Sequence, residues 1–252
     1  MSRHTPWASL LAVLIATSSG ARSASAQFEL AWDQCPGSSS ARSNKAFACQ
    51  DDNAQPMKLV LAFTPPTSLP RFVGYMAKVE ISSAESSLPD WWALGMGECR
   101  QGALSASLSF LGVLGQCQNP WTGDNTGGGY VIERSPTPGR ALLRFAFARA
   151  SIAPLSSGTR YFGATLLLEA AHASGSDGTR CAGCTAEVCL AVTEFEFDQA
   201  EDKDQGIAPE ADAFTRSSQS SVVTFNAIDP NANPCGATSR NTTWGRIKTS
   251  YR

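Results

Sequence analysis

Residues Cys181 to Phe197 read CAGCTAEVCLAVTEFEF, three cysteines followed at once by a strand pattern. In an extended chain, alternate side chains point to opposite faces. One face would carry Cys189, Ala191, Thr193, Phe195 and Phe197, and the other Val188, Leu190, Val192, Glu194 and Glu196. The first half is apolar on both faces, as in a central strand, and the second half alternates as if one face meets water. The segment therefore predicts a cross-linked β domain built around this strand.

The first 26 residues have the pattern of a secretory signal peptide. Arg3 supplies positive charge, the run from Trp7 to Thr17 is apolar, and Ala24 to Ala26 forms an A-x-A cleavage site. The apolar run is short for a bilayer span, although an N-terminal membrane anchor is the alternative. We expect an exported, secreted or periplasmic chain with no membrane segment after cleavage.

Secreted material provides the test of this expectation. Its intact mass should be that of a chain beginning at Gln27, because signal peptidase would remove the first 26 residues. A full-length mass would contradict the prediction.

Composition and charge indicate one domain of ordinary size. Residues 27–252 are enough for a full core and lie within the range of single all-β domains. The formal charge of −2 becomes −4 when Arg3 and Arg22 leave with the signal. This mild acidity offers no basic surface for nucleic acid or for an anionic membrane, so neither is an expected partner.

Alternating patterns predict eight strands and a ninth candidate. They span residues 28–32, 57–63, 71–82, 104–110, 140–149, 161–170, 188–197 and 221–228, with the ninth at 130–134. Turn chemistry separates them, including the glycines at 127–129, and a charged loop is expected from Asp198 to Thr215. Many short strands without alternating helices favour an all-β fold, a two-sheet β-sandwich.

Two short helices are also expected. Ser87 is a candidate N-cap for one, with Pro89 in its first turn. The other is a C-terminal helix from Trp244 to Tyr251, in which Trp244, Ile247 and Tyr251 share one face. A helix of this length is unstable alone, so it must dock on the sandwich or bind a partner.

All eight cysteines follow the predicted cleavage site: Cys35, Cys49, Cys99, Cys117, Cys181, Cys184, Cys189 and Cys235. An even number in an exported chain implies disulfides. Local pairing suggests the bonds Cys35–Cys49, Cys99–Cys117, Cys184–Cys189 and Cys181–Cys235. A zinc site formed by the last four cysteines and a redox dithiol at Cys181 and Cys184 are alternatives, but the required spacing and βαβ context are incomplete. We expect structural disulfides, with no metal or cofactor.

Three motifs resemble those of a group of uncharacterised exported bacterial proteins. They are Trp32-Asp33-Gln34-Cys35, the run Cys181-Ala182-Gly183-Cys184 with Cys189, and the ending NTTWGRIKTSYR from Asn241 to Arg252. The resemblance spans the exported chain and implies no activity. The strand pattern is also similar to cohesin-like and carbohydrate-binding sandwiches, a likeness of architecture that does not determine function.

Tryptophans are the main candidate ligand-binding residues. Trp91 and Trp92 follow Pro89-Asp90, and Trp121 lies in the segment NPWTG. Exposed flat rings of this kind hold sugars by stacking. The alternative is that the indoles fill the ends of the sandwich as part of its core.

Acidic residues provide the competing candidate site. Glu194 and Glu196 are roughly 6.6 Å apart along a strand, compatible with the paired carboxylates of a glycosidase, although any solvated strand face produces such pairs. His172 is the one histidine after the signal, and we expect it in a solvated loop. The segments 229–233 and 202–204 hold acidic residues but lack the rest of a calcium loop.

These features together predict a secreted, non-catalytic binding or structural module, with polysaccharide or a cell-surface component as the candidate partner. The alternative is a secreted glycosidase-like hydrolase that uses Glu194 or Glu196 with an aspartate. Exposed coplanar tryptophans would favour the module. A cleft holding two carboxylates, one with a raised pKa, would favour the hydrolase.

Overall fold

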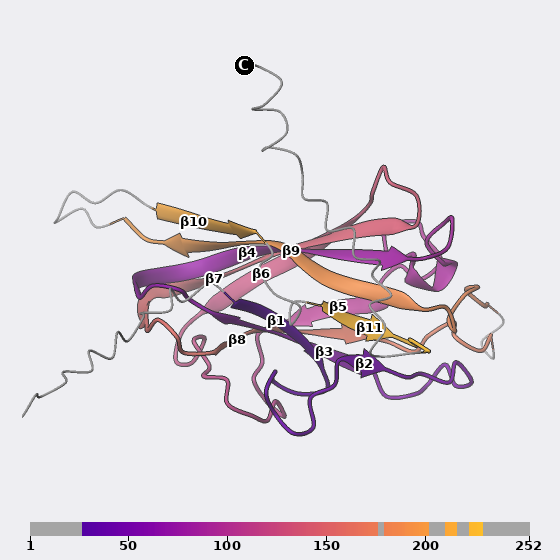
Figure 1. The fold of residues 1–252 in the computed structure, drawn as a ribbon, viewed down its shortest axis with the longest axis horizontal. Helices are drawn as coiled ribbons and strands as arrows, with labels where there is room; N and C mark the ends of the chain where they lie inside the picture. The colour runs from indigo at the N-terminus through magenta and orange to yellow at the C-terminus, as the bar shows by residue number, and fades with distance from the viewer. Residues whose placement is uncertain (1–26, 176–178, 202–209, 216–221, 229–252) are drawn as a thin grey trace, which may run out of the picture.

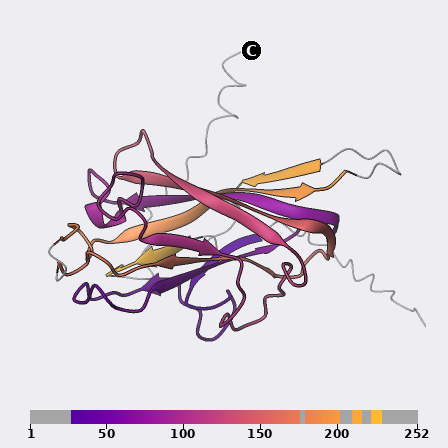
Figure 2. The same cartoon turned by 180° about the vertical axis from the view of Figure 1, so that it is seen from behind.

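The computed structural model describes residues 27–175, 179–201, 210–215 and 222–228, which form two facing β-sheets (Figures 1 and 2). The strands are β1 (Gln27–Trp32), β2 (Asn44–Lys45), β3 (Met57–Thr64), β4 (Leu69–Ser83), β5 (Leu104–Ser107), β6 (Thr126–Arg134), β7 (Arg140–Leu155), β8 (Tyr161–Leu168), β9 (Val188–Gln199), β10 (Glu210–Thr215) and β11 (Val222–Phe225). Sheet A has the order β1-β3-β8-β5. Sheet B has the order β2-β11-β9-β4-β7-β6, and β10 also pairs with β9. The predicted all-β, two-sheet fold is confirmed.

Several boundaries differ from the predicted ones. The glycines at 127–129 lie inside β6 and do not form a turn, and part of the expected charged loop is β10. The helix expected after Ser87 is a single 3-10 turn, η1 (Asp90–Trp92), whose N-cap residue is Pro89 and which has no side-chain cap. The C-terminal helix from Trp244 to Tyr251 lies outside the described residues.

Aromatic rings from both sheets meet in the core. Phe28 of β1 stacks on Phe195 of β9 with ring centroids 4.2 Å apart, and Phe195 also stacks on Tyr75 of β4 at 4.7 Å. Phe63 of β3 contacts the edge of Phe197 at 5.1 Å. Such ring pairs contribute about 0.5–1.5 kcal/mol beyond the apolar area they bury. They join sheet A to sheet B at the C-terminal half of β9.

A β-bulge in β9 changes which residues of this strand face the core. Lys78 of β4 pairs with Glu194, but Val79 pairs with Val192, so Thr193 is an extra residue. One extra residue reverses the alternation beyond it. Val192 and Phe195 therefore both face the core, and the prediction that Thr193 and Phe195 share a face is wrong. The bulge also marks where the outer edge of β9 changes partner, from β11 to β10.

The disulfides join distant segments rather than neighbours in sequence. Three bonds are described, Cys35–Cys117, Cys49–Cys184 and Cys99–Cys181, with Cα–Cα distances of 5.9 to 6.1 Å. Cys189 is also disulfide-bonded, and Cys235 lies outside the described residues. The predicted pairs Cys35–Cys49, Cys99–Cys117, Cys184–Cys189 and Cys181–Cys235 are therefore wrong. One reason is that β2, which lies between Cys35 and Cys49 in the sequence, pairs with β11. This pairing directs the chain away from Cys35 before it reaches Cys49.

The C-A-G-C segment holds two of these bonds close together. Gly183 adopts φ +82, and an added Cβ would lie 2.5 Å from Pro89. Only glycine adopts this conformation without strain while leaving room for Pro89. Cys181 and Cys184 can then bind Cys99 and Cys49 from a single turn.

Three disulfides are typical of proteins that fold in an oxidising, extracellular type of compartment. Within the described ranges, no helix is long and apolar enough to cross a membrane.

Candidate functional site

The tryptophans predicted to bind a ligand are buried. Trp91 and Trp92 have 0% exposed surface and Trp121 has 5%. Trp91 stacks on Phe225 of β11 at 5.2 Å, and Trp92 meets the same ring edge-on at 5.1 Å. These indoles fill one end of the sandwich. This was the alternative interpretation of the sequence, in which the tryptophans are part of the core. None of the three offers the exposed flat ring that sugar stacking requires, so that expectation is corrected.

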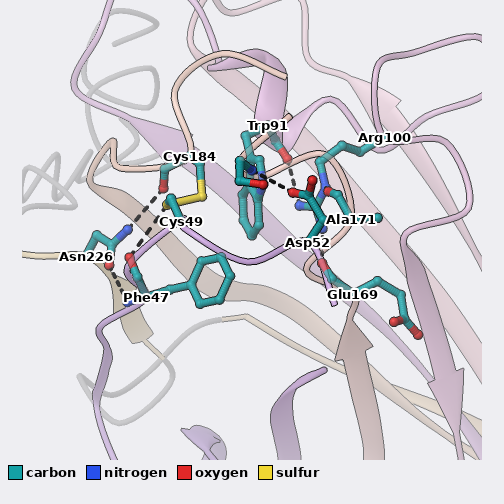
Figure 3. The surroundings of a disulfide bond; sticks show 10 residues. Phe47, Cys49, Asp52, Trp91, Arg100, Glu169, Ala171, Cys184 and Asn226 are labelled. Carbon is teal, nitrogen blue, oxygen red and sulfur yellow. Dashed lines mark hydrogen bonds between the residues drawn. A yellow bond between two sulfur atoms is a disulfide. The ribbon is translucent and has the colours of Figure 1, made fainter. Parts of the chain in front are cut away.

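A buried arginine holds the Trp91 end of the sandwich together (Figure 3). Arg100 lies 3.6 Å above the Trp91 ring and donates hydrogen bonds to the carbonyl oxygens of Trp91 (2.9 Å), Ala171 (3.0 Å) and Glu169. Burial lowers the pKa of Arg100 to about 9, so the guanidinium is still a cation at neutral pH. Because its Nε, Nη1 and Nη2 each donate to a main-chain carbonyl, Arg100 acts as a structural clamp.

Trp121 has a different structural role. Leu61 pairs with Ala164 while Ala62 pairs with Phe162, so Gly163 is the extra residue of a bulge in β8. The Trp121 Nε1–H donates to the carbonyl oxygens of Phe162 (3.1 Å) and Gly163 (2.9 Å). The indole thereby gives two buried carbonyls at the bulge a hydrogen-bond donor.

The outer face of sheet B holds a pocket of about 610 Å³, here called the sheet-face pocket. Strand register places two rows of outward residues around it, Gly129–Ala146–Met76–Glu196 and Val131–Arg144–Lys78–Glu194. Gly129 has no side chain and Ala146 has only a methyl group. Space therefore remains between the side chains of Met76 and Val131, and this space gives the pocket its depth. Its volume lies within the range of about 300–1,000 Å³ typical of ligand sites.

Charged groups of both signs border the sheet-face pocket. Lys78 pairs with Glu194 across β4 and β9, and Arg144 lies 3.5 Å from Glu133. Glu196 forms no ion pair within the described part of the chain. Burial, and secondarily the charge of Glu196, raise the pKa of nearby Asp198. The sequence identified Glu194 and Glu196 as candidate site residues. It did not predict the apolar floor, because the alternation of side chains within β4, β6 and β7 does not specify that these strands pair with one another.

Among the residues that the structure describes, the cysteine and histidine candidates do not form a reactive site. Cys181 and Cys184 belong to separate disulfides, which excludes both the zinc site and the redox dithiol. His172 is half-buried, and its Nδ1 lies 2.6 Å from the Thr179 hydroxyl. The acidic segments 202–204 and 229–233 lie outside the described residues.

These observations define a disulfide-linked β-sandwich with a pocket on one sheet face. No protein-family model matches the chain, and no curated protein matches it either.

Proposed function

We propose that this protein is an exported, non-catalytic binding module whose ligand occupies the sheet-face pocket. The observation that carries the proposal is the aliphatic floor of Met76, Val131 and Ala146 beside the carboxylate of Glu196, which forms no described ion pair. Ligand sites combine apolar walls with a few convergent polar groups in this way.

A polysaccharide is the proposed ligand class. The C–H face of a sugar ring suits an aliphatic floor, and its hydroxyls can hydrogen-bond to Glu196, Lys78 and Arg144. Binding would then rest on aliphatic and charged groups, since the three tryptophans considered above are buried.

A binding screen against soluble polysaccharides and a glycan array tests this proposal. Met76→Glu should weaken any binding by about tenfold or more, because it puts an extra charge on the apolar floor. Met96→Glu is the matched control, since Met96 is 92% exposed and lies outside the pocket, whereas Met76 is 45% exposed. Binding that is equal in wild type and Met76→Glu would place the ligand elsewhere, and no glycan binding at all would reject the polysaccharide class.

Hydrolysis is the second candidate function, and the raised pKa of Asp198 is the observation that favours it. A glycosidase needs a protonated acid near an ionised carboxylate, and Asp198 and Glu196 share the outer face of β9. The same polysaccharides should be monitored for new reducing ends. Release that is abolished by Glu196→Gln while binding persists would establish a hydrolase; our proposal expects no release from wild type.

A further inference from the structure

Strand β6 is an edge of sheet B, and its hydrogen-bonding geometry can be read from its two ends. Beside β6, Ala150 N–H donates to Asn125 O, and Ser135 N–H donates to Arg140 O. In an antiparallel pair, hydrogen-bonded and non-hydrogen-bonded positions alternate. The odd-numbered residues of β6 therefore bond to β7, and the main-chain groups of Thr126, Gly128, Tyr130, Ile132 and Arg134 point to the open edge. Within the described ranges, no strand pairs with that edge.

This edge lacks the usual protection against strand pairing. Edges are commonly guarded by proline, by lysine and other charges, or by bulges. From Thr126 to Ile132 the sequence TGGGYVI contains no charge and no proline. The register of β6 with β7 also runs without a bulge from Thr126 to Arg134.

A second pocket opens beside this edge, between β6 of sheet B and β5 of sheet A. This edge pocket has a volume of about 510 Å³, and Gly128, Phe147, Phe110 and Trp121 are among the residues that line it. An added Cβ at Gly128 would lie 2.5 Å from the Phe147 ring. Because Gly128 has no side chain, the Phe147 ring packs into the space beside the strand, where it is buried and lines the edge pocket.

We propose that β6 accepts an extended segment of a partner protein, added antiparallel to its open edge. Residues directly opposite each other in a sheet share a face. The segment's residue opposite Gly128 would therefore place its side chain in the edge pocket, against Phe147. The exposed lining of the edge pocket is mainly polar, with Ser107 and Asn119 at its margin, so a polar side chain of the segment suits it.

A second copy of the chain fits the site less well than a separate segment. A second β6 would bring Tyr130 and Ile132 to the inner face of the joined sheet. Both side chains are already packed against the protein's own core, and the Tyr130 hydroxyl donates to Leu104 O on β5. They are therefore not free to fill the edge pocket of another copy.

The test uses linear dodecapeptides selected from a random phage library on the full exported chain. Hydrogen exchange with the synthetic peptide should slow at the amides of Gly128, Tyr130, Ile132 and Arg134. The amides of residues 127, 129, 131 and 133 should change little, since they already bond to β7. This alternate pattern is specific to strand addition.

Two variants separate the backbone and side-chain parts of the proposal. Thr126→Pro removes one outward N–H at an edge where proline is tolerated, and Ala106→Trp fills the edge pocket; each should weaken the peptide by about tenfold or more. Ser105→Trp, on the opposite face of β5, is the matched control for Ala106→Trp and should bind normally. Met76→Glu should also bind the peptide normally, which distinguishes this site from the sheet-face pocket.

Three results would overturn the proposal. The first is a library that yields no peptide producing alternate protection. The second is equal peptide binding by wild type and both edge variants. The third is alternate protection in the free protein that rises with its own concentration. The last result would identify a second copy as the occupant.

Discussion

Arg100→Ala should lower the free energy of unfolding by about 4 kcal/mol. Three main-chain carbonyls would lose a charged donor, and each hydrogen bond to a charged group contributes about 1.5–3 kcal/mol. The Trp91 ring would also lose the guanidinium packed 3.6 Å above it. Part of this loss is offset because the variant no longer has to bury a cation. Urea denaturation with the disulfides intact measures the change.

Two control variants make the Arg100 result specific. Arg100→Lys keeps a cation but lacks the planar fork that reaches several carbonyls, so it should recover only part of the stability. Arg134→Ala removes an arginine whose ion pair with Glu98 is largely exposed on the arginine side, and it should cost less than about 1 kcal/mol. A loss below about 1 kcal/mol for Arg100→Ala would mean that the freed carbonyls find other partners, contrary to the clamp described above.

Removing the Cys49–Cys184 bond by a double change to alanine should cost about 4 kcal/mol. The bond joins residues 135 positions apart, but the intact Cys99–Cys181 bond shortens the loop that it closes to about 55 residues, for which the chain-entropy model gives a cost of this size. The folded structure should change little, because Asn226 also links the two segments. It accepts from Phe47 N–H (2.7 Å) and donates to Cys184 O (3.0 Å; Figure 3).

Asn226→Ala is the matched control, because it breaks these hydrogen bonds and keeps the disulfide. Its expected cost is about 2–3 kcal/mol, from two hydrogen bonds of about 1 kcal/mol each and from the φ of +51 at this position, which alanine tolerates less well than asparagine. Denaturation midpoints of both variants, compared under non-reducing conditions, provide the measurement. A double variant as stable as wild type would show that the bond constrains the unfolded chain far less than its loop length implies.

The strands and most of their core faces followed from the sequence, because alternation is a local property of an extended chain. Leu143, Phe145 and Phe147 of β7 are buried on one face as predicted, and so are Tyr75, Val79 and Ile81 of β4. Glu194 and Glu196 were also correctly placed together on one face of their strand. Local pattern was insufficient where a bulge intervened, as at Thr193, because the extra residue is defined only by the partner strand.

Glycine and tryptophan were misread for a related reason. The glycines at 127–129 look like a turn in isolation, yet Gly128 serves the close approach of β6 to the Phe147 ring. Trp91 and Trp92 look like loop residues, yet Phe225 and Arg100 arrive from distant segments to bury them. In both cases the residue that determines the structural role is remote in sequence.

The sequence by itself determined the class of the fold, the positions of its main strands and the prediction of disulfides, since these depend on alternation, turn residues and an even number of cysteines. Only the tertiary structure decided which cysteines pair, that the tryptophans are core, and where the sheet-face pocket and the open β6 edge lie. Each of these depends on distances between segments joined by long loops. A one-dimensional pattern specifies which face of a strand is apolar, but it does not specify which strand lies opposite.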